Sequence, residues 1–460
     1  MKMTKRAYKY LILLPLTLFI FACGSGGGSG PAEEEGVSDD SLMTLVQYAT
    51  FQYFWDGAEP TSGMARERYH VDGVYPQDDK NVVTSGGSGF GVMAILVGIE
   101  RGFISREEGL QRLEKILSFL ETADRFHGMY SHWIYGPTGK AKPFSKKDNG
   151  ADGVESAYLF QGLLTVRQYF RNGSQREKAL AERIDKLWRE AEWSWFRKDQ
   201  ENILYWHWSP DYNWDMNFGI KGYNECLIYY VLAASSPTYP VPAEVYHEGW
   251  ARNGNIDTTV TTYGYVLTMK HNSAYTYGGP LFWAHYSYLG LDPRGLKDRY
   301  ADYWEHNRNH TLINRQWCLE NPNGFKGYGA SCWGLTSSYS RLKDGSTGYV
   351  GHKPGPKDSG VISPTAALSS IPYTPEYSLE AMRGFYEIYG DSLLGKYGFY
   401  DALSPEYDWF PKRYLAIDQG PIVVMIENYR SGLLWDLFMS CPEVRHGLDA
   451  LGFEYRKPDK

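Results

Sequence analysis

Two kinds of helix alternate along most of this chain. Segments at 89–99, 152–170, 215–234, 278–289, 329–335 and 420–438 are apolar on nearly every side. Segments at 41–55, 105–120, 174–195, 296–319 and 375–389 are apolar along one face only, and a short helix is expected at 244–250. A helix that is apolar all round is buried, whereas an amphipathic helix lies at the surface. The pattern therefore predicts an all-α fold, a double-layered toroid in which amphipathic helices surround an inner ring.

The same pattern predicts one folded domain, at 41–460. No stretch alternates between apolar and polar residues for long enough to form a separate sheet domain. No sequence period recurs, which argues against a repeat solenoid. Each apolar helix is preceded by a loop rich in glycine, aromatic and polar residues, such as 85–90 and 149–153. In a toroid these loops gather at one end, where they surround a central pocket.

The first 22 residues have the features of a lipoprotein signal peptide. Basic residues between Lys2 and Lys9 precede an apolar stretch at 11–22 that is too short for a membrane span. Ala22 is followed by Cys23, which we interpret as the lipidated first residue of the mature protein; an ordinary secretory signal is the alternative. Residues 23–40 then form a flexible tether. We expect an exported lipoprotein in the periplasm or outer membrane of a Gram-negative bacterium.

The composition and charge of the chain exclude some classes of function. The net charge is −7 without long basic runs, so there is no nucleic-acid footprint. Aromatic residues make up 16% of the chain, and their flat faces suit sugar rings as well as ordinary cores. Neither the histidines nor Cys226, Cys318, Cys332 and Cys441 have metal-ligand spacing, so we expect buried free thiols, no metal and no cofactor. A monomer is expected.

Acidic side chains lie where several apolar helices begin. Asp152 and Glu155 are three residues apart at the start of 152–170 and would share one helix face. They are either a helix cap or functional groups, because buried acids are costly unless paired or used. Glu225, within an apolar segment, is the most informative acid, and its alternative role is an ion pair with Lys221. Asp418 begins the last apolar helix.

This pattern suits the hydrolysis of glycosidic bonds, which needs one protonated and one ionised carboxyl group. Burial among aromatic residues would keep Glu225 protonated as the general acid. Helix starts would keep Asp152 or Asp418 ionised as the base, with Glu155 supporting. The further candidates for substrate contact are Trp206, Trp208, Trp214, Asp215, Trp283, His285, Trp333, Glu427 and Arg430. Some of the tryptophans would be plain core, and Glu427 with Arg430 could instead form a structural ion pair.

The sequence resembles the bacterial glycoamylase-like family, which is common among lipoproteins of gut Bacteroidetes. The resemblance rests on the stretches at 150–155, 223–225, 277–282, 363–368, 417–421 and 426–430, which span nearly the whole mature chain. It implies an (α/α)6 toroid of the six-hairpin glycosidase type that cleaves β-1,2-glucan with inversion, to sophorose or short sophorooligosaccharides. It also implies that Asp152, Glu155, Glu225 and Asp418 line the acidic pocket, and it leaves open which aspartate is the base.

Two classes of protein fit these observations. The first is a glycoside hydrolase, for which an α-1,4-glucan exo-hydrolase (a glucoamylase) is the main alternative activity and a phosphorolytic enzyme a weaker one. The second is a non-catalytic surface lipoprotein that binds glycans. A binding protein needs aromatic platforms but no buried proton donor, so the acids at the helix entrances favour the enzyme. The sequence does not separate cleavage at chain ends from internal cleavage.

Overall fold

The computed structural model describes residues 37–272 and 274–456. The chain divides into two units, of which the second begins at Asp39, and the fold described here is that of the second unit. The predicted signal peptide and Cys23 lie outside the described residues, as does most of the predicted tether. No helix in the described part of the chain is long and apolar enough to cross a membrane.

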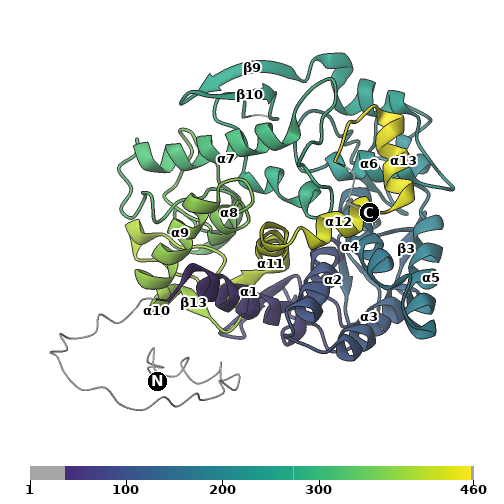
Figure 1. Cartoon of the computed structure of the whole chain (residues 1–460), viewed down its shortest axis with the longest axis horizontal. Helices are drawn as coiled ribbons and strands as arrows, with labels where there is room; N and C mark the ends of the chain where they lie inside the picture. The colour runs from purple at the N-terminus through teal and green to yellow at the C-terminus, as the bar shows by residue number, and fades with distance from the viewer. Residues whose placement is uncertain (1–36, 273, 457–460) are drawn as a thin grey trace, which may run out of the picture. The chain divides into compact units, whose positions relative to one another are not determined.

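The second unit is built mainly of helices (Figure 1). They are α1 (Asp39–Trp55), α2 (Ser85–Glu100), α3 (Arg106–Leu120), α4 (Gly153–Phe170), α5 (Gln175–Arg189), α6 (Leu227–Ser235), α7 (Tyr303–Glu320), α8 (Pro364–Leu368), α9 (Pro375–Glu387), α10 (Gly390–Leu393), α11 (Ala416–Arg430), α12 (Leu433–Met439) and α13 (Pro442–Leu451). Short 3-10 turns cover Leu281–Ala284 and Tyr286–Tyr288, and a π-helix covers Val245–Trp250.

The helices form the two layers that the alternation predicted. The inner layer is α11, α2, α4 and α6, each packed on the next, continued by the two 3-10 turns and by α8, which packs on α11. In the outer layer α1 packs on α2 and α11, α3 on α2, α5 on α4 and α9 on α8. Nearly every residue of α2 and α4 is buried, whereas α3 and α5 bury one face. The predicted double-layered toroid is confirmed.

Strands are short and only accompany the helices. They are β1 (Arg68–His70), β2 (Val82–Thr84), β3 (Arg125–Phe126), β4 (Met129–Tyr130), β5 (Trp133–Tyr135), β6 (Ala141–Lys142), β7 (Ala151–Asp152), β8 (His207–Trp208), β9 (Asp257–Thr262), β10 (Tyr265–Met269), β11 (Ser337–Arg341), β12 (Thr347–Gly351), β13 (Leu394–Gly395), β14 (Gly398–Phe399) and β15 (Arg413–Leu415). No sheet of the described residues has more than three strands.

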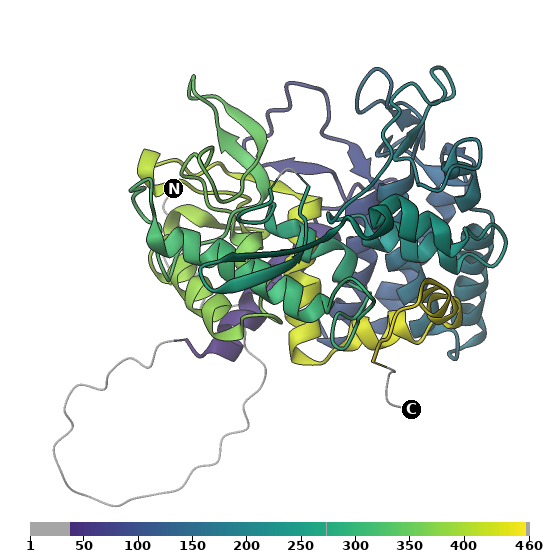
Figure 2. The ribbon, with the colours of Figure 1, turned by 90° about the horizontal axis from the view of Figure 1, so that it is seen from above.

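Three of these strands lead directly into inner helices. β2 precedes α2 and pairs with β5, β7 precedes α4 and pairs with β8, and β15 precedes α11 and pairs with β1. Figure 2 shows the loops and short strands gathered on one side of the ring, together with the β11–β12 hairpin, while α12 and α13 lie on the other side. The expected gathering of the helix entrances at one end is therefore present.

The glycine-rich stretch before residue 90 differs from the prediction. It is not a loop, because α2 already begins at Ser85. A Cβ atom on Gly89 would lie 2.2 Å from the Tyr158 carbonyl oxygen, and one on Gly162 would lie 2.1 Å from the Gly89 carbonyl oxygen. These glycines thus bring the backbones of α2 and α4 into direct contact, which outweighs the low helix propensity of glycine.

Several predicted helices are shorter or interrupted. The segment at 215–234 becomes helical only at Leu227, after Gly222, whose φ of +81° a helix does not allow. The segment at 278–289 forms only 3-10 turns, and 329–335 forms no helix, so α8 contributes to the inner layer instead. Gly432, with a φ of +75°, separates α11 from α12.

The predicted helix starts and thiols are confirmed. Ser105 with Glu108 and Ser174 with Glu177 each form the capping box that the sequence indicated. The four described cysteines are buried free thiols.

Candidate active site

Asp152 caps α4 and is bound on every side. Its Oδ1 accepts hydrogen bonds from the backbone N–H groups of Val154 at 3.0 Å and Glu155 at 2.9 Å. Its Oδ2 accepts from His132 Nδ1 at 3.1 Å and from the Trp206 indole N–H at 3.1 Å. The carboxylate is fully buried, and these four bonds use its full capacity as an acceptor. The predicted cap is therefore present, and it is joined to two aromatic side chains that the spacing did not connect.

The charge state of Asp152 depends mainly on His132. Burial would raise the pKa of Asp152, but the hydrogen bond and positive charge of His132, together with His207 and the helix N–H groups, outweigh it and hold that pKa low. Burial would in turn lower the pKa of His132, but the charge of Glu155 and the bond to Asp152 raise it to about 9. At neutral pH the pair is an imidazolium on a carboxylate.

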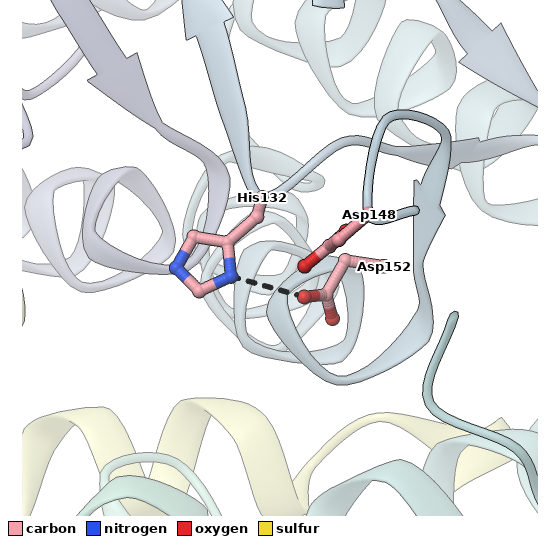
Figure 3. Close-up of side chains that lie close together, drawn as sticks. All are labelled: His132, Asp148 and Asp152. Atoms are coloured by element: carbon pink, nitrogen blue, oxygen red, sulfur yellow. Dashed lines mark hydrogen bonds and ion pairs between the residues drawn. The ribbon is translucent and has the colours of Figure 1, made fainter. Parts of the chain in front are cut away.

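His132, Asp148 and Asp152 place a ligand atom each within 4.8 Å of one another (Figure 3). Such spacing also suits a small cation. His132 Nδ1, the nitrogen that would bind a metal, donates to Asp152 Oδ2 at 3.1 Å, and His207 Nε2 lies 3.3 Å from Asp148 Oδ2. These contacts fit a hydrogen-bonded cluster rather than a metal site, because a metal would need His132 Nδ1 without the proton that it donates to Asp152.

Glu155 lies one turn into α4, beside this cluster. Its Oε2 accepts from the Gly86 N–H at 3.0 Å and from the Thr84 hydroxyl at 3.4 Å, while its Oε1 lies 4.0 Å from His132 Nε2. A Cβ atom on Gly86 would lie 2.2 Å from Glu155 Oε2, so the N–H contact requires glycine. Burial first, and then the charge of Asp152, raise the pKa of Glu155 to about 7, against the opposing charge of His132.

Glu225 precedes α6 and is half-buried, so it is not inside a helix as predicted. Its backbone carbonyl accepts from the Tyr158 hydroxyl at 3.2 Å and from Ser287. Burial, and then the charge of Glu155, raise the pKa of Glu225 to about 7. Among the described residues no lysine or arginine forms an ion pair with it, and Lys221 is exposed. The expected rise of its pKa toward neutrality is confirmed.

Asp418 differs from the expectation that it is an ionised carboxylate. It is fully buried in the first turn of α11, with Oδ1 accepting from the Tyr286 hydroxyl at 3.3 Å and no backbone N–H on its side chain. Burial and the neighbouring Asp401 raise its pKa well above the usual value, and burial raises that of Asp401 to about 6. Asp401 takes the available backbone donor, the Tyr339 N–H at 2.6 Å. The two acids form a pair that retains a proton, because like charges this close do not both ionise.

Four of the predicted tryptophan contacts differ in exposure and in what they pack against. Trp206 is half-buried, binds Asp152 and stacks on the exposed ring of Phe218 with centroids 5.5 Å apart. Trp208 in β8 is half-buried and pairs with Ala151, next to Asp152. Trp214 is half-buried but packs mainly on outer aromatic rings, and Trp283 is only 9% exposed, against Gly279.

The other predicted contact residues are bound to neighbouring side chains or to the backbone. Trp333 is 0% exposed and donates to the Tyr377 carbonyl, and His285 is 1% exposed and bound to Ser370, so neither presents a surface to a ligand. Asp215 is exposed and 3.2 Å from Lys147.

Glu427 and Arg430 lie at the far end of α11. Glu427 lies nine positions after Asp418, which is about 13.5 Å along the helix axis. Glu427 binds Arg101 through two hydrogen bonds, at 2.6 and 2.9 Å, and Arg430 binds Asp40. These are ion pairs that fasten helix ends, the alternative that the sequence left open for them, although with different partners.

Sequence reasoning missed His132, Asp148 and Asp401. None has a diagnostic spacing to the acid that it contacts, and each arrives from a separate loop. The one available signal was position, because His132 directly precedes β5, the strand that pairs with the entrance strand β2.

An ionised carboxylate and a proton-holding carboxyl group at the same end of the ring are the pair of groups that glycoside hydrolysis requires. Comparison with known proteins agrees. A sequence model of the Glycoamylase family, described as "Putative glucoamylase", matches residues 217–442. The solved structure of an endo-β-1,2-glucanase from Chitinophaga pinensis, in complex with sophorotriose and glucose, is 66% identical with a TM-score of 0.89, and the match covers 91% of this chain and 99% of that one.

Two further relatives indicate the same family. A solved structure from Bacteroides caccae ATCC 43185, described as a "putative glucoamylase", is 62% identical with a TM-score of 0.88 and covers 91% of this chain and 100% of that one. The curated exo β-1,2-glucooligosaccharide sophorohydrolase (non-reducing end) of Parabacteroides distasonis is 45% identical over 434 residues, 90% of this chain. The present chain spans 58% of the length of that relative. The chain belongs to the glycoamylase-like family of glycoside hydrolases.

Proposed function

We propose that this protein hydrolyses β-1,2-linked glucan. The observation that carries the proposal is Glu225, a half-buried carboxyl group whose pKa is raised to about 7, at the same end of the ring as the ionised Asp152. The names of the relatives from Chitinophaga pinensis and Parabacteroides distasonis support the linkage. They favour β-1,2-glucan over α-1,4-glucan, and an enzyme over a glycan-binding lipoprotein.

In the proposed mechanism Glu225 is the general acid. It protonates the glycosidic oxygen as the bond breaks, which a carboxyl group still protonated near neutral pH can do. Water attacks the anomeric carbon from the opposite face, and the configuration is inverted. Inversion needs room for that water, so the acid and the base should be about 6.5–9.5 Å apart when substrate is bound.

Asp152 and Asp418 are the two candidates for the base, and they have different surroundings. Asp152 is ionised, but its oxygens already accept four hydrogen bonds. Asp418 shares its proton with Asp401 and receives only the Tyr286 hydroxyl. Turnover by Asp152→Asn and Asp418→Asn separates them, because the asparagine variant of the true base loses about 10²–10⁴-fold while remaining folded.

The mode of cleavage is the finer part of the proposal. We expect sophorose or short sophorooligosaccharides as products. The two named relatives differ in that one is an endo-enzyme and the other an exo-enzyme. Chromatography of the products formed from β-1,2-glucan, starch and laminarin tests the function. We expect products from β-1,2-glucan alone, whereas glucose released from starch with β-1,2-glucan left intact would overturn the proposal.

We also propose that the enzyme is an exported lipoprotein of the periplasm or outer membrane, carrying lipid on Cys23. The basic and apolar pattern of residues 1–22, ending in Ala22-Cys23, supports this. Labelling of expressing cells with radioactive palmitate should mark the wild-type protein and leave Cys23→Ser unmarked. Equal labelling of both proteins would contradict the assignment.

A further inference from the structure

His132 faces two carboxylates of the site, those of Asp152 and Glu155. Its Nδ1 donates to Asp152 Oδ2 at 3.1 Å, and its Nε2 lies 4.0 Å from Glu155 Oε1. The imidazole is 21% exposed, and the ring of Phe144 stacks on it with centroids 4.4 Å apart. Figure 3 shows the imidazole turned toward Asp152. The ring plane and both nitrogens are thus held in place by neighbours from different parts of the chain.

The charges that act most strongly on His132 are those of three acids, Glu155, Asp152 and Asp148. Asp152 and Glu155 face it from α4, and Asp148 faces it from the loop before β7. His207, in β8, lies between Asp148 and Asp152, at 3.3 and 3.9 Å from their Oδ2 atoms. Glu155 in turn lies close enough to Glu225 for its charge to act on that residue. The positive charge of His132 therefore lies between the acids Asp152 and Glu155, and Glu155 in turn acts on Glu225.

We propose that His132 is a positioning residue of the glycosidase site: held as an imidazolium on Asp152, it places a positive charge against Glu155 and, through Glu155, governs the proton on Glu225. The inference rests on the proposed function only in naming Glu225 as the acid. The arrangement of charges itself is a property of the unliganded protein.

The consequence of removing this charge has a definite sign. Without the imidazolium, Glu155 faces Asp152 alone and holds its proton to higher pH. A neutral Glu155 no longer repels the ionised form of Glu225, so Glu225 loses its proton at lower pH. An opposite charge at this distance shifts a carboxyl pKa by about 1–3 units. His132→Asn should therefore move the alkaline limb of the kcat/KM profile on β-1,2-glucan to lower pH by roughly one unit.

The experiment combines this profile with a titration that needs no substrate. His132→Asn and His132→Gln should both shift the alkaline limb in the same direction, and His446→Asn, on the exposed surface of α13, should leave it unchanged. In protein labelled with 13C at the histidine Cε1, the His132 signal should remain that of an imidazolium up to about pH 8, because two acids face it. In Glu155→Gln its midpoint should fall by about one unit or more.

The outcomes separate the two proposals. An unchanged profile in both His132 variants, or a His132 signal that titrates near pH 6.5 as a free histidine does, overturns the role of His132. A purely structural role would lower the melting temperature of the variants without moving either midpoint, and this too overturns it. If the protein does not cleave β-1,2-glucan but the His132 midpoint still depends on Glu155, the proposed function fails and the charge arrangement stands.

Discussion

Replacement of Gly89 by alanine tests how the inner ring holds the site together. The new Cβ would lie 2.2 Å from the Tyr158 carbonyl oxygen and 2.6 Å from the Leu159 Cα, both backbone atoms that no rotamer change can move. The α2 and α4 backbones must then separate. Overpacking of this kind costs about 1–3 kcal/mol, and the gain in helix propensity returns about 1 kcal/mol. Because atoms of this contact are backbone, we place the cost at the upper end and expect a net loss of about 2 kcal/mol.

The same displacement reaches the catalytic end of the helices. Gly86, three residues earlier in α2, donates its N–H to Glu155 of α4 at 3.0 Å. Gly89→Ala should therefore lower both the free energy of unfolding in urea and the turnover on β-1,2-glucan. Gly390→Ala is the matched control, since a Cβ atom there meets only the Phe385 carbonyl oxygen, at 4.0 Å. A Gly89→Ala protein as stable and active as the control would refute the close packing of α2 on α4.

Three further results are expected. Trp206→Ala should weaken the binding of sophorooligosaccharides with little change in melting temperature, whereas Trp333→Ala, at a fully buried position, should lower stability by about 3–5 kcal/mol; the reverse pattern in calorimetry would contradict the assignment of both. Burial lowers the pKa of His285 and His306 to about 3 and of His310 to about 4, so below about pH 6.5 each binds a proton in the unfolded chain but not in the folded one, and the contribution of His285 to the free energy of unfolding, measured in urea as the difference between the wild type and His285→Gln, should fall as pH drops from 6.5 toward 4; a difference that stays constant over that range would contradict the neutral buried state. Activity should survive EDTA, because His132 Nδ1 donates its proton to Asp152 and is not free to bind a metal; loss with EDTA and recovery with added calcium would show a missed metal site.

Local patterns in the sequence predicted the helices well where local interactions decide them. The capping boxes at Ser105 and Ser174 bind neighbours three residues away, and they mark the true starts of α3 and α5. The glycine-rich start of α2 was misjudged because its cause is not local. Glycine favours loops, but contact with Tyr158 and Glu155, about 70 residues further on, makes it necessary in a helix here.

The acidic residues of the site show the same difference between local and long-range interactions. The position of Asp152 at a helix start predicted its cap and its ionised state, since the N–H groups that it binds are its own neighbours. The position of Asp418 predicted the same ionised state and was wrong, because burial, and then Asp401 from another part of the chain, raise its pKa. His132 was missed for the same reason, because it also reaches the site from another part of the chain. A pKa is set by whichever groups the fold brings together, and only the helix ends are visible in the sequence.

The turnover of Glu225→Gln on β-1,2-glucan tests the central claim most directly. Glutamine keeps the size of the side chain and removes the proton that the mechanism transfers, and no ion pair of the described residues is lost with the carboxylate. We predict a folded protein with the wild-type melting temperature and a kcat lower by at least about 10²–10⁴-fold. Turnover near that of the wild type would contradict the account, because the proton would then come from another group.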